Sequence, residues 1–114
     1  MGINRFEDVI DWQKTKELSV KIYTLFFESK VFGFKDLIQR ASASVMNNIA
    51  EGFERKSNKE FNQFLYIAKG SYGKVGSMLY LANNLNKITE KDFRIFFNFS
   101  EEISKIRSGL IKTL

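Results

Sequence analysis

The amino-acid sequence predicts an all-α protein, a single domain over residues 1–114 folded as an antiparallel up-down-up-down four-helix bundle. Three observations lead to this fold class. Apolar residues recur every three or four positions through long stretches of the chain, proline is absent, and residues typical of helix ends separate the stretches. A chain of 114 residues suits one domain and is too short for two.

The first helix is expected from about Phe6 to Phe27 and the second from about Phe34 to Ala50. Each has one side of apolar and small residues, the pattern of a helix with one buried face. In the first helix the inward residues are Trp12, Thr15, Ser19, Ile22 and Phe26. In the second they are Leu37, Ile38, Ala41, Val45, Asn48 and Ile49. Gly52 marks the end of the second helix, because glycine readily takes the left-handed conformation that closes a helix.

The third helix is predicted from a capping box, in which Ser57 accepts from the amide near Glu60 and Glu60 reaches back. Its inward residues are Phe61, Phe64, Leu65, Ala68, Tyr72, Val75, Leu79 and Ala82. Thr89 is the expected cap of the fourth helix, with Ile88 and Phe93 as its hydrophobic staple. The inward residues of the fourth helix are Phe96, Phe99, Ile103, Ile106, Leu110 and Leu114.

Cysteine and histidine are both absent. Without them the chain cannot form a disulfide, a Cys/His zinc site or the histidine-dependent nucleophile systems of hydrolases. No apolar run approaches the roughly 18 to 20 residues that span a bilayer, and the N-terminal residues lack a signal-peptide core. We therefore expect a cytoplasmic, non-enzymatic protein without a metal or a cofactor.

Three of the four helices have a second apolar side in addition to the inward one. A single four-helix bundle has one interior, so a second apolar side favours burial against another subunit. The alternative is that these are scattered surface residues, which are normal on any protein. The candidates for a homo-oligomer interface are Val9, Val20, Phe27, Tyr66, Gly73, Tyr80, Phe93, Phe97 and Ile111.

Polar residues follow one edge of the second helix. A catalytic interpretation would make Glu51 a general base and Arg40 an anion ligand, but the two are separated by about 16 Å of axial rise. The favoured interpretation is structural, with Asn48 and Glu51 bonding to the turn that follows the helix. The residues assigned to this turn are Asn48, Glu51, Gly52, Ser57 and Glu60.

Glycine recurs at Gly70, Gly73 and Gly76 inside the third helix. Each glycine costs about 1 kcal/mol relative to alanine in a helix interior. The spacing lacks the Gly-Lys-Ser/Thr ending of a phosphate loop. We therefore expect a neighbouring helix to approach closely here, either within the bundle or from another subunit.

Positive charge is concentrated between residues 55 and 87, where six basic residues accompany one acidic residue in a chain of net charge +5. Lysines on the outward side of the third helix alternate with Tyr66 and Tyr80, an arrangement that can hold phosphates and stack bases. A lysine-rich face that is only solvated is the alternative. The candidate nucleic-acid-binding residues are Arg55, Lys56, Lys59, Lys69 and Lys74.

Three sequence blocks carry a family resemblance. They are residues 6–14 (FEDVIDWQK), residues 40–52 (RASASVMNNIAEG) and residues 55–71 (RKSNKEFNQFLYIAKGS). The chain closely resembles the four-helix bundle family of 23S rRNA intervening-sequence proteins, whose relatives include the accessory variability determinant protein of diversity-generating retroelements. The resemblance covers essentially the whole chain.

The resemblance implies a barrel-like, ring-shaped homopentamer. It also implies possible partners, since the retroelement relatives bind nucleic acid and a reverse transcriptase. Two functional hypotheses follow for this chain. The first is a non-enzymatic oligomeric adaptor or scaffold for a protein partner. The alternative is sequence-independent RNA or DNA binding through the basic surface of the third helix.

Overall fold

The computed structural model describes residues 2–114, and every regular element in that range is helical. A short 3₁₀ turn at Phe6–Asp8 precedes four α-helices. These are α1 (Ile10–Phe26), α2 (Phe32–Glu54), α3 (Asn58–Asn84) and α4 (Glu90–Lys112). The predicted all-α fold with four helices is thus confirmed, and none of the described helices is long and apolar enough to cross a membrane.

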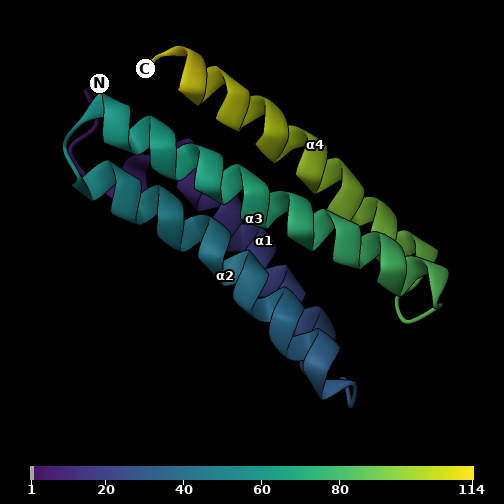
Figure 1. Ribbon diagram of the computed structural model, residues 1–114. Helices are drawn as coiled ribbons and strands as arrows, with labels where there is room; N and C mark the ends of the chain where they lie inside the picture. The colour runs from purple at the N-terminus through teal and green to yellow at the C-terminus, as the bar shows by residue number, and fades with distance from the viewer. Residues whose placement is uncertain (1) are drawn as a thin grey trace.

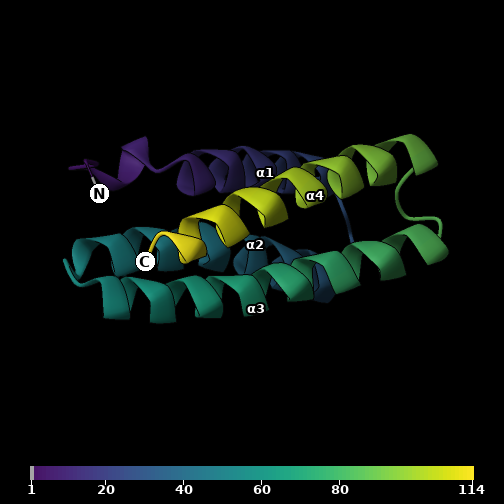
Figure 2. The same cartoon turned by 90° about the horizontal axis from the view of Figure 1, so that it is seen from above.

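Consecutive helices run in opposite directions, and the N- and C-termini lie at the same end of an elongated molecule (Figure 1). The molecule measures 43 × 23 × 19 Å. Seen from above, α1 and α4 form one layer and α2 and α3 the other (Figure 2). Each helix therefore packs against the helices before and after it, and α4 closes the bundle against α1.

The core consists of two clusters of buried side chains. The cluster nearer the α1–α2 turn includes Leu18, Ile22, Ile38, Leu79 and Ile103. The cluster nearer the termini includes Val9, Val45, Ile49, Phe53, Phe61 and Leu65. Tyr72 packs against both clusters. Most of the predicted inward residues are buried, but Leu37 is 45% exposed, so its inward assignment was wrong.

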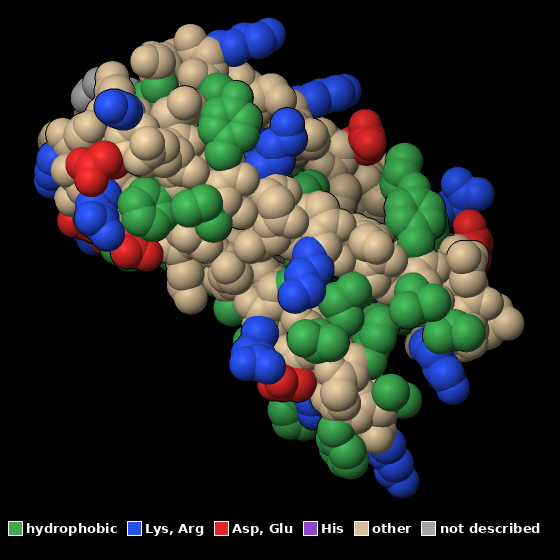
Figure 3. All heavy atoms as spheres, in the orientation of Figure 1, with side chains coloured by type: hydrophobic (Ala, Val, Ile, Leu, Met, Phe, Trp, Pro, Cys, Tyr) green, Lys and Arg blue, Asp and Glu red, His purple; other side chains and the backbone are tan. Residues whose placement is uncertain are grey.

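The α1–α2 and α3–α4 turns diverge at the end of the molecule opposite the termini (Figure 1). Hydrophobic side chains gather on both sides of this gap in the surface view (Figure 3). A pocket of about 250 Å³ lies there, with Phe26, Phe34 and Leu85 among its lining residues. The bundle is therefore packed less tightly at this end than along its centre.

Two helix boundaries differ from the prediction. The first helix begins at Ile10 because residues 6–8 form a 3₁₀ turn, in which the Val9 amide donates to the Phe6 carbonyl at 3.0 Å. The second helix continues past Ala50 to Glu54. Here the predicted left-handed Gly52 was wrong, since among residues 2–114 no glycine has a positive φ and the backbone instead turns at Lys56, with φ 61°.

Gly52 has a packing role. It is buried inside α2, and a Cβ built on it would lie 2.5 Å from the Phe64 Cβ of α3. A real side chain could not occupy that space without moving one helix. Glycine at this position therefore permits α2 and α3 to approach each other closely.

The turn between α2 and α3 agrees only partly with the structural interpretation. The Glu60 amide donates to the Ser57 hydroxyl at 3.4 Å, which confirms the cap, while the Glu60 carboxylate lies 3.8 Å from Arg55. Glu51 also pairs with Arg55, at 3.2 Å. Asn48 was wrongly assigned to this turn, because its amide nitrogen donates to the Ser44 carbonyl oxygen one helical turn earlier, at 2.8 Å.

Candidate functional site

Six of the nine predicted interface residues lie along the seam between α3 and α4. On α3, Tyr66 and Tyr80 face this seam, and the seven-residue spacing of Tyr66, Gly73 and Tyr80 places Gly73 between them on the same face. On α4 the seam residues are Phe93, Phe97 and Ile111. Residues that were predicted to form separate apolar sides on two helices thus lie together on one surface.

One end of the seam is aromatic. The ring of Tyr80 meets the ring of Phe93 edge-on, with centroids 5.1 Å apart, and Phe97 follows at 6.4 Å from Phe93. Phe93 is half-buried against the core, whereas Tyr80 is 52% exposed and Phe97 is 43% exposed. This end therefore presents aromatic surface that the folded chain does not cover.

Gly73 lies in the middle of the seam, and Gly70 and Gly76 precede and follow it on α3. A Cβ built on Gly70, Gly73 or Gly76 would meet nothing within 4 Å. No helix within residues 2–114 therefore makes the close approach that these glycines were predicted to permit. The described part of the bundle is therefore not the source of this approach, and a contact with a neighbouring subunit stays a prediction.

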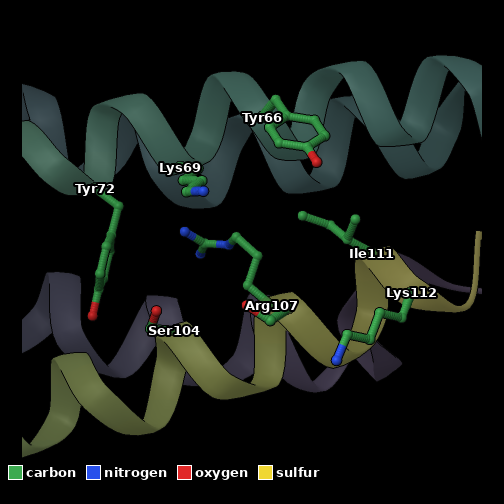
Figure 4. Close-up of a pocket in the computed structure, with 8 residues that line it drawn as sticks. Tyr66, Lys69, Tyr72, Ser104, Arg107, Ile111 and Lys112 are labelled. Atoms are coloured by element: carbon green, nitrogen blue, oxygen red, sulfur yellow. The ribbon is translucent and has the colours of Figure 1, made fainter.

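The other end of the seam holds a pocket of about 280 Å³ between α3 and α4 (Figure 4). Its lining combines three cationic side chains, two tyrosines, two serines and one apolar residue. They are Tyr66, Lys69, Tyr72, Ser104, Arg107, Ser108, Ile111 and Lys112. No acidic residue lines this pocket within the part of the chain that the structure describes.

Arg107 is the inner cation of this pocket and belongs to a buried ion pair. Its Nε and Nη2 atoms donate to the two carboxylate oxygens of Asp11, each at 2.9 Å, and Nη2 also lies 3.3 Å from the Thr15 hydroxyl. Asp11 is 1% exposed and Arg107 is 3% exposed. The pair joins α1 to α4 across the bundle, with its guanidinium held in a fixed plane.

Tyr72 lies over this pair. The Arg107 guanidinium carbon is 5.1 Å from the Tyr72 ring centroid. The phenol oxygen is buried and forms no hydrogen bond of normal geometry with residues 2–114. Burial raises the pKa of Tyr72, while the nearby Ser100 hydroxyl and Arg107 guanidinium act in the opposite direction. The phenol therefore keeps its proton at neutral pH and can act as a donor.

The five predicted nucleic-acid-binding residues do not form one site. Arg55 is paired with Glu51 and Glu60, and the Lys56 ammonium lies 5.6 Å from the Phe53 ring centroid. Lys59 and Lys74 are exposed on α3 without an ion pair to any described residue. Lys69 alone lines the pocket, where α4 adds two cations that the sequence reading missed, Arg107 and Lys112.

The other three predicted interface residues, Val9, Val20 and Phe27, lie away from the seam. Of these, Val9 was assigned wrongly. It is 2% exposed and packs in the core cluster near the termini, so it has no surface to offer a second subunit. Its position just before α1, after the 3₁₀ turn, places it outside the helical phase used for the prediction. Val20 and Phe27 are exposed on α1 and at its end.

The comparisons with known proteins agree with the fold. A crystal structure of a protein of unknown function from the S23 ribosomal protein family of Bacteroides thetaiotaomicron superposes with a TM-score of 0.82. The two sequences are 28% identical, and the match covers 90% of this chain and 99% of that one. No curated protein matches the sequence. Residues 7–109 match the 23S rRNA-intervening sequence protein family, which confirms the resemblance found in the sequence. The chain belongs to that family.

Proposed function

We propose that the protein is a non-enzymatic, cytoplasmic scaffold that assembles as a ring-like homopentamer through the aromatic end and the middle of the α3–α4 seam. The observation that carries this proposal is the aromatic end of the seam, where Tyr80 and Phe97 remain exposed after the chain has folded. The number of subunits comes from the family resemblance, and the seam supplies the contact surface.

The seam has the two properties that a helix-to-helix subunit contact needs. Its aromatic rings supply apolar area, which stabilises association by about 25 cal/mol for each Å² removed from water. Its open glycine row around Gly73 lets a neighbouring backbone come close. In a ring, the seam of one copy packs against a different face of the next copy. Five copies close when the rotation between neighbours is one fifth of a full turn, with no rise along the axis.

The assembly is tested by the mass of the protein in solution. Light scattering after size exclusion should give about 67 kDa for five copies of the 13.3 kDa chain. Phe97→Glu places a charge in the contact and should lower the mass toward the monomer while helicity is unchanged. Leu37→Glu is the matched control, because Leu37 is 45% exposed and Phe97 43%, and it lies on α2 away from the seam.

Two results would contradict the scaffold proposal as stated. A wild-type mass near 13.3 kDa at micromolar concentration would exclude a stable assembly. A Phe97→Glu variant with the wild-type mass would show that the contact between subunits does not include Phe97 and its end of the seam. If Leu37→Glu dissociated the assembly to the same extent, the effect of Phe97→Glu would not be specific to the seam, and the assignment of the contact to the seam would fall.

Nucleic-acid binding is the second candidate function. It is supported by Lys59 and Lys74, which are exposed on α3 and have no ion pair with any described residue. Binding through lysines should be independent of sequence and should weaken with salt, at about −0.7 in logarithmic slope per phosphate contact with a single strand. A mobility-shift titration at two salt concentrations tests it. Lys59→Gln with Lys74→Gln should weaken the complex and lower the slope, and unchanged binding would argue against this surface.

A further inference from the structure

The pocket at the seam has an unbalanced positive charge. Lys69 from α3 and Lys112 from α4 both line it, and neither forms an ion pair within residues 2–114. Arg107 of α4 is the third cation, and its guanidinium group points toward Lys69 (Figure 4). Of these three cations, only Arg107 has a carboxylate partner among the described residues, which is Asp11 at 2.9 Å. The lining residues therefore carry about two unbalanced positive charges, and an anion would be attracted to this end of the seam.

Hydrogen-bond donors surround the same space. Arg107 uses Nε and Nη2 on Asp11 and Thr15, which leaves Nη1 without a protein partner among the described residues. The Tyr72 ring forms one wall, and its buried hydroxyl points away from Lys69 and Arg107 (Figure 4). Ser104 and Ser108 add hydroxyl groups on α4.

The rest of the pocket is suited to an aromatic group. Tyr66 lines the mouth with its ring 53% exposed, and Ile111 adds an apolar side chain. The Lys69 ammonium lies 5.8 Å from the Tyr66 ring centroid, so cation and ring are adjacent. The volume of about 280 Å³ greatly exceeds that of one phosphate ion. It lies near the small end of ligand pockets, which begin at roughly 300 Å³.

We propose that this α3–α4 pocket binds a nucleoside monophosphate. Lys69, Lys112 and the free side of Arg107 hold the phosphate dianion, and Tyr66 stacks on the base. The nucleotide is either free or the phosphorylated end of an RNA strand, and both present the same chemistry. This inference does not rest on the scaffold function or on lysine contacts along α3.

Isothermal titration of the full chain with inorganic phosphate and with AMP tests the proposal. AMP should bind more tightly than phosphate, because the phosphate alone lacks the stacking contact. Lys69→Gln with Lys112→Gln should weaken AMP binding by about tenfold or more, since charge-assisted hydrogen bonds to phosphate are lost. Lys21→Gln with Lys91→Gln is the matched control: it removes the same charge from exposed positions on α1 and α4 outside the pocket and should change AMP affinity by less than about twofold at physiological salt.

Tyr66→Ser tests the aromatic part, and it should reduce AMP affinity to that of phosphate. Two RNA oligonucleotides that differ only in a 5′-phosphate then distinguish the sources. Preference for the phosphorylated strand over AMP assigns the pocket to an RNA end, and the reverse assigns it to a free nucleotide.

Three results would overturn the inference. The first is that the wild type binds neither AMP nor phosphate, and the second is that AMP and phosphate bind equally. The third is that the control pair loses as much affinity as the pocket pair, because the overall positive charge of the protein would then explain the binding. The mass of Phe97→Glu and the affinity of Lys69→Gln with Lys112→Gln are separate measurements, so this proposal and the scaffold can fail independently.

Discussion

Replacement of Asp11 by asparagine should destabilise the fold strongly. The substitution hardly changes side-chain size, but it removes the one carboxylate that pairs with Arg107 among residues 2–114, and Arg107 is 3% exposed. Breaking one partner of a buried ion pair typically costs about 3–5 kcal/mol, because the remaining charge stays in a poorly solvated site. A domain of 114 residues has a total stability of roughly 6–17 kcal/mol at 0.05–0.15 kcal/mol per residue.

Urea denaturation followed by circular dichroism measures this loss, at one fixed protein concentration because assembly adds to apparent stability. In thermal unfolding followed by the same signal, the melting temperature should fall by about 12–20 °C. Asp36→Asn is the control, because Asp36 pairs with Arg40 at the surface and should contribute less than about 1 kcal/mol. Asp11→Leu with Arg107→Met should recover most of the stability. A loss below about 1 kcal/mol for Asp11→Asn, or a double variant no better than the single one, would refute the reasoning.

The same unfolding assay checks three further predictions. Gly52→Ala should cost about 1–3 kcal/mol because its Cβ would lie 2.5 Å from the Phe64 Cβ, whereas Gly73→Ala, in open space, should stabilise the isolated chain by up to about 1 kcal/mol. Because burial raises the pKa of Tyr72, the unfolded phenol loses its proton first; stability should therefore decline as pH rises above the ordinary value of 10.0. Tyr72→Phe should show a smaller decline between about pH 9 and 11, and an equal decline would contradict the assignment. Ser57→Ala should cost about 1 kcal/mol through loss of the α3 cap, and an unchanged midpoint would mean that the cap contributes nothing.

The helices were predictable because their signals are local. Apolar spacing identifies a buried face within a few turns, and a cap such as Thr89 needs only the next three residues, where its hydroxyl accepts from the Asp92 amide at 3.0 Å. The same local logic failed at Gly52. A glycine near a helix end usually closes the helix, but here the contact with Phe64 determined its role. Tertiary packing outweighed a local preference.

The candidate site was only partly predictable, because it depends on contacts between distant segments. Lys69 and Tyr66 stood out by charge and aromaticity on one helix. Arg107 did not, since its partner Asp11 is 96 residues away in the chain. A hint was present: Arg107 follows the buried Ile103 by four residues, which places a cation on the inward side of the fourth helix. Its partner could be identified only after α1 and α4 had been placed side by side.

The modest burial of α4 has a consequence for how the molecule opens. Among the 23 residues of α4 only Phe96, Ile103 and Arg107 are buried, whereas α2 buries seven residues. Segments with few buried side chains open at a lower free-energy cost than the whole domain unfolds, and their amide hydrogens exchange sooner. A partially open form that releases α4 and keeps the α2–α3 hairpin would separate Phe97 from Tyr80 and Lys112 from Lys69. A single local transition would thus remove the aromatic contact surface and the cationic pocket together, and anything that binds either one would hold α4 in place.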